Sequence, residues 1–320
     1  MSKVSNTINV GFWENQLCER GTTVAVYDYA YFNKTILNNN SFIFYDKNNK
    51  ENNENIIKKF KKEFEVFGVD NFEEADEIIK DKSITHLYTI KGGQKDNKVS
   101  KYAKNCIHCV FNATEPHGDV YSCISSVVAG YKKEFPIVPH IINLPKHDEN
   151  MRKELKIPKE AIVFAGYGGR GSFDIKFVHK VVYDVAQKNP NIYFLFANFM
   201  KFCPDLSNII HLPTITDMRE KVRFINTSNA MLWGRRQGET FGIAIGEFSS
   251  LNKPVVAIKT GDLSHYNILQ NKGVWYSDPY SLHRILTTYN EERVRERDWN
   301  AYRDYEPEKV IKIFEKTYLS

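Results

Sequence analysis

The chain has 320 residues, which is more than one hydrophobic core usually holds, so two domains are expected. Hydrophobic residues make up 42% of it and charged residues 26%, as is typical of a globular protein. The net charge of +5 favours phosphate-bearing ligands or an anionic membrane surface, but no basic tract is concentrated enough to indicate a nucleic-acid partner.

The sequence predicts a cytoplasmic protein with reduced cysteines. No apolar stretch has membrane-spanning length, and the amino terminus has no hydrophobic signal core. The cysteines are odd in number and scattered, which indicates free thiols: Cys18, Cys106, Cys109, Cys123 and Cys203. Cys106 and Cys109 have C-x-x-C spacing, but they lie in an apolar run, so a buried strand is favoured over a redox or metal site.

The first half of the sequence alternates apolar segments of strand length with helical patterns. A strand is expected at 8–13, and Gly21, Thr22 and Thr23 supply a turn and an N-cap for a helix that runs to about Phe32. Further strands are expected at 41–45, near Val66, at 85–90 and at 106–112, with helices at 55–64 and 72–82. This alternation predicts a mostly parallel sheet covered on both faces, as in a Rossmann-like domain.

The loop after the first expected strand lies where an open α/β sheet binds ligands, at the carboxyl ends of its strands. It leads to Gly21 and Thr22, which are therefore candidates for contact with a phosphate or a sugar. Asp28 and Tyr29 follow within the expected helix. They are either contacts for an acceptor molecule or a capped, surface-facing pair.

A second such loop, ATEPHGD, follows the strand expected at 106–112. It contains His117, the best-placed histidine of the chain for contact with a ligand. An isolated loop histidine is usually a surface residue, and that interpretation stays open. His108 is the alternative candidate, but its neighbours indicate the interior of a strand.

A polar run at 146–149, a short expected helix at 150–155 and a break at Ile157-Pro158 predict a hinge between two domains. The alternation then repeats. Strands are expected at 161–165, 192–197, 209–212, 230–234 and 255–258, and helices at 174–188, 218–226, 240–251 and 281–289. The second half is therefore expected to be another Rossmann-like domain.

The first strand of this half runs into a glycine-rich loop, GYGGRGS, before the helix expected at 174–188. A glycine such as Gly169 allows the backbone amides of this loop to come close to the oxygens of a phosphate. Arg170 is placed to bind those oxygens through two N–H groups, and Lys176 adds a positive charge at the start of the helix. The alternative is that the glycines form an ordinary turn.

Two carboxylates frame the helix expected at 240–251, Glu239 at its entrance and Glu247 eight residues later. In an ideal helix they lie roughly 12 Å and about 80° apart, so that both face one elongated ligand. The free N–H groups of Thr240, Phe241 and Gly242 lie between them and favour an anion. A nucleotide-sugar fits this layout. The alternative is that Glu239 only complements the helix dipole and Glu247 is a solvated charge.

This stretch resembles the E-x7-E signature of retaining glycosyltransferases of family 4, which have the GT-B fold. The matching residues are Glu239, Phe241-Gly242, Glu247 and Pro254-Val255. The segment RKELKIPKEAIVFAGYGG resembles the entry to the carboxy-terminal domain of the same family. The resemblance covers nearly all of residues 150–320 and, more thinly, the amino-terminal half.

The resemblance implies roles for five residues. Glu239 is expected to position the donor sugar and Glu247 to bind the ribose. Arg170 and Lys176 are expected to bind the diphosphate, and His117 to face the sugar from the other domain. No metal site is implied, because the helix dipole and the cations take up the charge of the leaving diphosphate.

The resemblance also implies the architecture and the reaction. Two Rossmann-like domains, 1–145 on the acceptor side and 146–300 on the donor side, are expected to face each other across a cleft, with 301–320 forming a helix that crosses back. The expected reaction moves a sugar from a nucleotide-sugar, with UDP- or GDP-sugars favoured, to a hydroxyl of a glycan or another acceptor, without a further cofactor. The alternatives are an epimerase and a nucleotide-sugar-binding protein on the same fold.

Overall fold

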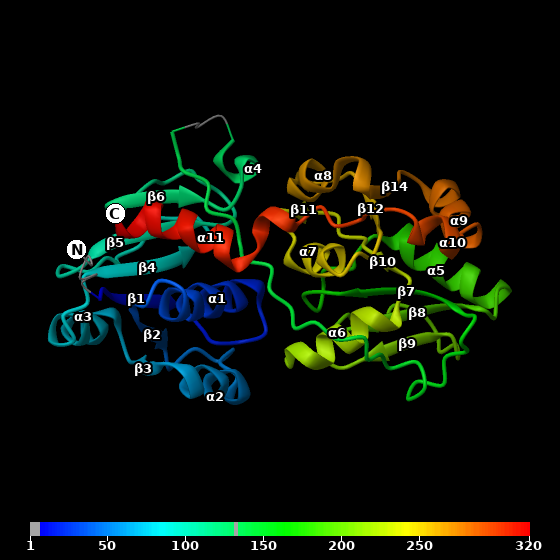
Figure 1. The fold of residues 1–320 in the computed structure, drawn as a ribbon. Coiled ribbons are helices and arrows are strands. Elements are labelled where there is room, and N and C mark those ends of the chain that lie inside the picture. The colour runs from blue at the N-terminus through cyan, green and yellow to red at the C-terminus, as the bar shows by residue number, and fades with distance from the viewer. Residues whose placement is uncertain (1–6, 131–133) are drawn as a thin grey trace, which may run out of the picture. The chain divides into compact units, whose positions relative to one another are not determined.

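The computed structural model describes residues 7–130 and 134–320. The chain forms two compact units (Figure 1). The first comprises Met1–Ile141 together with Tyr305–Ser320, and the second comprises Ile142–Asp304. The end of the chain therefore belongs to the first unit. No helix within the described residues is both long and apolar enough to cross a membrane.

The first unit is built on a parallel sheet with the strand order β3-β2-β1-β4-β5-β6. Its strands are β1 (Asn9–Glu14), β2 (Asn40–Asp46), β3 (Glu65–Val69), β4 (His86–Lys91), β5 (Lys104–Cys109) and β6 (Val120–Cys123). The helices between them are α1 (Gly21–Thr35), α2 (Glu54–Glu63), α3 (Phe72–Asp81) and α4 (Ser126–Ala129). Asn53 and Asn71 cap α2 and α3 through their side chains, as helix starts prefer.

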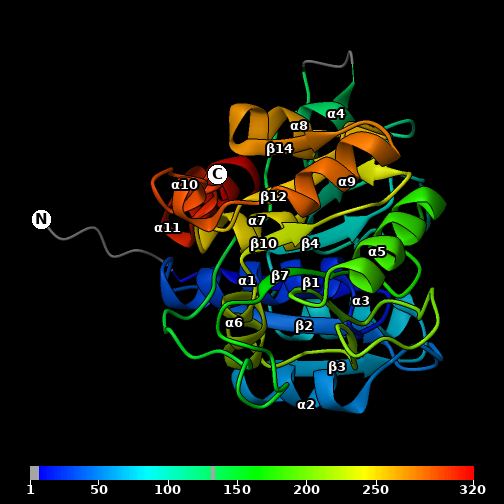
Figure 2. The same ribbon diagram turned by 90° about the vertical axis from the view of Figure 1, so that its right-hand side faces the viewer.

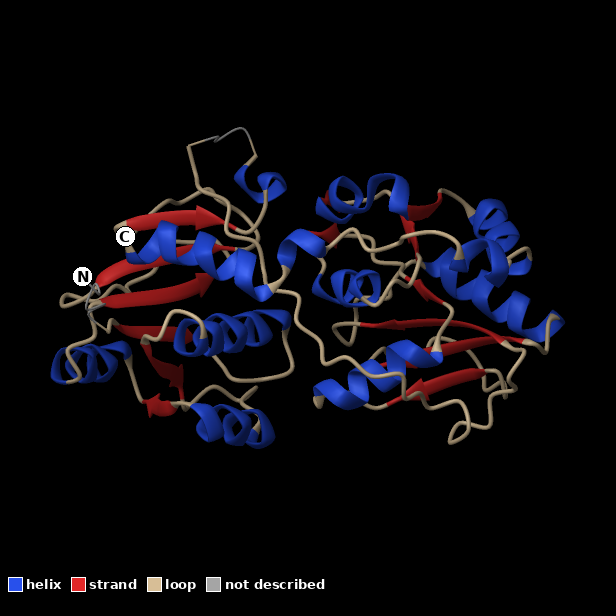
Figure 3. Cartoon of the chain, viewed as in Figure 1, coloured by secondary structure: helices blue, strands red, loops and turns tan. Residues whose placement is uncertain are grey.

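The last helix of the chain, α11 (Pro307–Phe314), covers one face of this sheet together with α1 (Figure 3). Pro307 begins the helix, where its missing N–H costs nothing. The Phe314 ring packs against Phe12 of β1 and stacks on Tyr29 of α1 at a centroid distance of 5.1 Å. A π-helical turn at Glu315–Leu319 follows. Burial of these aromatic rings explains why the end of the chain folds with its beginning.

The second unit repeats this architecture, with the strand order β14-β12-β10-β7-β8-β9 and all pairs parallel. The strands are β7 (Ile162–Tyr167), β8 (Ile192–Ala197), β9 (Ile209–Leu212), β10 (Ala230–Leu232), β12 (Val255–Ile258) and β14 (Gly273–Tyr276). A separate pair consists of β11 (Gly238–Glu239) and β13 (Asp262–Leu263). The helices are α5 (Lys176–Lys188), α6 (Met218–Thr227), α7 (Ile243–Ser250), α8 (Ser264–Leu269), α9 (Pro279–Thr287) and α10 (Glu291–Arg295).

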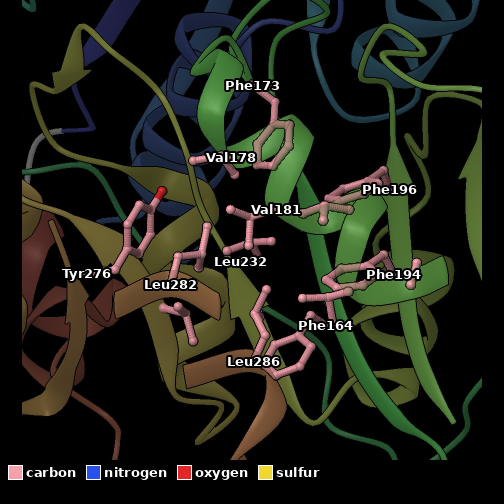
Figure 4. Packing of buried hydrophobic residues seen from close by; sticks show 14 of the residues in the cluster. Phe164, Phe173, Val178, Val181, Phe194, Phe196, Leu232, Tyr276, Leu282 and Leu286 are labelled. Atoms are coloured by element: carbon pink, nitrogen blue, oxygen red, sulfur yellow. The ribbon is translucent and has the colours of Figure 1, made fainter. Parts of the chain in front are cut away.

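Helices α5 and α9 cover one face of the second sheet, and α6 and α7 cover the other (Figure 2). Valines of α5 and leucines of α9 pack on aromatic residues of the central strands, including Phe164 and Phe194 (Figure 4). Because this core is close-packed and apolar, it fixes the strands from which the loops of the candidate site emerge.

Several local predictions are wrong. Residues 150–155 form turns instead of a helix. The helix α1 begins at Gly21 itself, its N-cap is Arg20, and no side chain caps it. The expected strand at 106–112 ends at Cys109, and the strand β6 was not predicted. The helix expected at 240–251 begins only at Ile243.

Candidate functional site

The glycine-rich loop of the second unit follows the carboxyl end of β7, at the sheet edge where α/β folds bind ligands. Its backbone is held at several points: Asn198 Nδ2 donates to Gly168 O at 2.8 Å, and the N–H of Met200 donates to Arg170 O at 3.0 Å. Arg170 and Lys176 are exposed, and Lys176 is the first residue of α5. The loop is thus an ordered turn that presents Arg170 to solvent, and the start of α5 presents Lys176.

Glu239 lies in β11, three residues before the N-cap of α7, so the ideal-helix spacing between the two carboxylates does not apply. Trp233 Nε1 donates to Oε1 of Glu239 at 3.1 Å, and Arg235 Nη1 donates to Oε2 at 3.3 Å. Burial raises the pKa of Glu239, and the charge of Arg235 partly offsets this effect. Trp233 and Arg235 therefore fix the direction of this carboxylate.

The start of α7 lies three residues later than expected. Gly242 is the N-cap and adopts a left-handed conformation with φ of 88°, which glycine adopts without strain. The free N–H groups of the first turn are consequently those of Gly242, Ile243, Ala244 and Ile245. Thr240 and Phe241 precede the helix, and the Phe241 ring is buried against Tyr302 at 5.7 Å. Of the three predicted anion-binding amides, only that of Gly242 belongs to the helix.

Glu247 is a buried residue of α7 with an exposed fraction of 2%, so the interpretation as a solvated charge is wrong. Lys221 Nζ of α6 donates to its Oε1 at 2.9 Å, and the Tyr167 hydroxyl of β7 donates to its Oε2. Lys221 also lies over the Tyr167 ring, at 5.4 Å from its centroid. Burial and the Glu247 charge raise the pKa of Tyr167 well above its ordinary value. Glu247 therefore links α7 to α6 and to the strand that leads into the glycine-rich loop.

In the first unit, His117 lies in the loop between β5 and β6 and is buried, so it is not a surface residue. Its Nδ1 donates to Glu115 O at 2.8 Å, and its Nε2 accepts from Lys91 Nζ at 3.0 Å. Lys91 in turn pairs with Asp96 at 2.5 Å. These contacts on both ring nitrogens fix the orientation of the imidazole. The expected contact of His117 with a donor sugar stays a prediction.

The region around the start of α1 contains a residue that the sequence analysis missed. Glu14, the last residue of β1, is 5% exposed, and its Oε2 has no hydrogen-bond partner among the described residues. Burial raises the pKa of Glu14 to about 8, against a hydrogen bond from Thr22. Gly21 and Thr22 form the first turn of α1 beside it. A buried carboxyl group next to a helix start is therefore part of this candidate loop.

Two alternative candidates of the first unit are core residues. Tyr29 is fully buried and donates through its hydroxyl to Pro139 O at 2.7 Å, so it is neither an acceptor contact nor surface-facing. His108 is also fully buried, and its Nδ1 lies 2.7 Å from the Tyr88 hydroxyl. Burial lowers the pKa of His108 to about 3, so it stays neutral. Within the described residues, no group of three or more His, Cys, Asp or Glu side chains has the arrangement of a metal site.

The architecture is similar to that of several solved glycosyltransferases. A glycosyltransferase from Rickettsia africae is 14% identical with a TM-score of 0.70, over 98% of this chain and 99% of that one. Anabaena HepE in complex with UDP and glucose is 10% identical with a TM-score of 0.73, over 97% and 99%. Sucrose-phosphate synthase of Thermosynechococcus elongatus is 12% identical with a TM-score of 0.70, over 97% and 98%. No protein-family model and no curated protein matches the chain.

The two parallel sheets and the return of the last helix to the first unit define a two-domain α/β protein of Rossmann-like halves. Together with the similarity to glycosyltransferase structures over nearly the whole chain, they show that the protein has the GT-B fold. The fold class predicted from the sequence is confirmed. Membership of family 4 stays a prediction.

Proposed function

We propose that the protein is a retaining glycosyltransferase that moves a sugar from a UDP- or GDP-sugar to a hydroxyl group of a glycan or another acceptor, without a divalent metal. One observation carries this proposal. In the second unit, Glu239 and Glu247 flank the start of α7, and the strand that holds Tyr167, the partner of Glu247, leads directly into the loop with Arg170. Proteins of similar structure are glycosyltransferases, and one of them holds UDP and glucose.

The chemistry of each group supports its proposed role. Arg170 and Lys176 are exposed cations that bind the diphosphate, and the free N–H groups at the start of α7 add to them. This positive charge stabilises the departing nucleoside diphosphate in place of a metal ion. Glu247 binds the ribose, and Glu239, which accepts from Trp233 and Arg235, uses remaining lone pairs to bind donor-sugar hydroxyls. The expected roles of Gly21, Thr22 and His117 stay predictions.

The substitution Glu239→Gln tests the proposal. It keeps the shape of the side chain and an acceptor for Trp233, but it removes the charge that strengthens hydrogen bonds to sugar hydroxyls. Transfer is expected to fall by about ten- to a hundredfold, which corresponds to one hydrogen bond to a charged group. The assay follows nucleotide release from the sugar donor that the protein binds, and NMR of the product shows whether the anomeric configuration is retained.

The matched control is Glu160→Gln, the same change at an exposed carboxylate of the same unit. It is expected to leave turnover unchanged. Wild-type turnover in Glu239→Gln, with circular dichroism showing a folded protein, would contradict the role of Glu239. Release of an isomerised nucleotide-sugar instead of a transferred sugar would identify an epimerase.

A further inference from the structure

Two cysteines of the first unit lie opposite each other on neighbouring strands. Cys109 of β5 and Cys123 of β6 are partners in the parallel register, and both are fully buried. Side chains at paired positions of adjacent strands point to the same face of the sheet. The spacing of adjacent strands, about 4.8 Å, falls within the range of roughly 4.4–6.8 Å between the Cα atoms of a disulfide. A disulfide between them therefore fits the backbone as it stands.

The C-x-x-C motif in the sequence consists of Cys106 and Cys109, so it does not predict the pair Cys109 and Cys123. Cys106 and Cys109 are three residues apart in one strand, so their side chains point to opposite faces of the sheet. Cys106 lies 3.7 Å from Tyr318 O of the C-terminal segment, and burial raises its pKa to about 12. Cys106 therefore stays an unreactive thiol.

Cys109 has the surroundings of a reactive thiol. Hydrogen bonds from Cys123 and from Tyr121, together with backbone N–H groups of Phe111 and Asn112, lower the pKa of Cys109 against the effect of burial. The thiolate is the nucleophilic form of cysteine. Disulfide formation needs a nucleophilic thiolate and a second thiol in contact with it. Cys109 and Cys123 supply these two groups.

Gly92 and Gly93 lie against the sulfur of Cys109. Its Sγ lies 3.7 Å from Gly92 O, and a Cβ atom placed on Gly93 would lie only 3.0 Å from the same sulfur. Gly92 is exposed, whereas Gly93 is buried against the backbone of Asn112, so an oxidant reaches the sulfur from this side only when the loop opens. Local opening of such a loop costs much less than global unfolding and admits a small oxidant.

We propose that Cys109 and Cys123 form a reversible disulfide when the protein meets hydrogen peroxide. The Cys109 thiolate attacks the peroxide oxygen, and its sulfur becomes a sulfenic acid while the O–O bond breaks and, with one proton taken up, water leaves. The Cys123 thiol then attacks that sulfur, the S–S bond forms, and the sulfenic oxygen leaves as a second water. The two sulfurs lose two electrons in total and the peroxide gains them.

The pair adjoins a candidate residue of the proposed function, although the oxidation itself does not depend on that function. The Tyr121 hydroxyl donates a hydrogen bond to Cys109, and the Tyr121 ring lies 5.9 Å from that of His117. Lys91, which donates to His117, is the register partner of Cys109 on β4. Disulfide formation removes the thiolate that Tyr121 contacts. Because the Tyr121 ring also contacts His117, we expect the first structural change around His117.

The test treats the reduced protein with hydrogen peroxide, blocks the remaining thiols by alkylation and maps the peptides without reduction by mass spectrometry. A linked peptide that joins Cys109 to Cys123 is expected, and dithiothreitol is expected to restore both thiols. The variant Cys106→Ser is expected to form the same link. In Cys123→Ser, a sulfenic acid at Cys109 that dimedone traps is expected instead.

Two results would overturn the proposal. One is oxidation of Cys18 or the half-buried Cys203 while Cys109 stays a thiol in folded protein. The other is oxidation of Cys109 to sulfinic acid without any link to Cys123. If Cys123→Ser does not fold, the wild-type protein still tests the proposal. Its linked peptide tests the disulfide, and a faster reaction of Cys109 than of Cys106 with iodoacetamide tests the reactivity of Cys109.

Discussion

Replacing Glu14 with glutamine is expected to raise the free energy of unfolding at pH 9 by several kcal/mol and to leave it nearly unchanged at pH 4. Glu14 is buried at the end of β1 with one oxygen unpartnered among the described residues. Burial raises its pKa from 4.5 to about 8. At about 1.4 kcal/mol per pKa unit, ionising this group in the folded state costs about 5 kcal/mol as an upper estimate.

The sign follows from which state holds the proton. Between pH 4.5 and about 8 the folded protein keeps Glu14 protonated, whereas the unfolded chain has released that proton. The stability contributed by this group is therefore fully present below pH 4.5 and is lost as the pH rises through about 8. A carboxylate held in an ion pair has the opposite dependence. Glutamine resembles the neutral acid at every pH, so the variant lacks this loss.

Urea unfolding of the wild type and of Glu14→Gln at pH 4, 7 and 9 measures the effect. The control is Glu73→Gln, because Glu73 is an exposed carboxylate of the same unit. It is expected to follow the wild type at each pH. Equal stability of Glu14→Gln and wild type at pH 9 would show that Glu14 ionises without cost and is therefore solvated.

Replacing Lys221 with methionine is expected to destabilise the second unit by about 3–5 kcal/mol, the typical cost of removing one partner of a buried ion pair. The side chains of Lys221 and Glu247 are only 11% and 3% exposed, so water solvates the remaining carboxylate poorly. The charge of Glu247 would then be buried and supported only by the Tyr167 hydroxyl. Thermal and urea unfolding measure the loss.

The double variant Lys221→Met/Glu247→Gln separates the ion pair from simple packing. It is expected to recover much of the lost stability, because no uncompensated charge is left in the interior. The control is Lys201→Ala, which removes an exposed ion pair with Asp205 and is expected to cost less than about 1 kcal/mol. If the double variant is no more stable than Lys221→Met, the loss comes from packing and the charge of Glu247 is not the cause.

The regular elements of the fold could be predicted because their apolar spacing is local. The strand at 255–258 and most of α5 follow from runs of aliphatic residues that any sheet with a covering helix must bury. The segment 150–155 could not be predicted in this way. The Arg152 guanidinium donates to backbone carbonyls of Pro158, Ala161 and Thr227, and these contacts hold the chain in turns. Thr227 lies 75 residues from Arg152 in the sequence, so this contact has no local signal.

The sequence predicted most of the residues that belong to the candidate site, but it did not predict which side chains they contact. The two carboxylates and the glycine-rich loop stand out in the sequence, but their partners do not. Lys221 is 26 residues and Tyr167 is 80 residues from Glu247, so only the folded sheet brings them together. The later start of α7 depends on the left-handed backbone of Gly242, which the helical spacing of the apolar residues conceals. The partners of Glu239 are close in sequence, since Arg235 and Trp233 lie four and six residues before it.

The binding of a nucleotide-sugar is tested most directly by thermal unfolding in EDTA with UDP, GDP, ADP, CMP and their common sugar conjugates. Ligand binding to the folded state raises the Tm in proportion to the logarithm of the ligand concentration over Kd. A selective rise with UDP or GDP and the matching sugar conjugate is expected. It should be much smaller in Arg170→Ala and unchanged in Lys180→Ala, an exposed cation further along α5. A folded wild-type protein whose Tm does not respond to any of these nucleotides would contradict the proposed donor site.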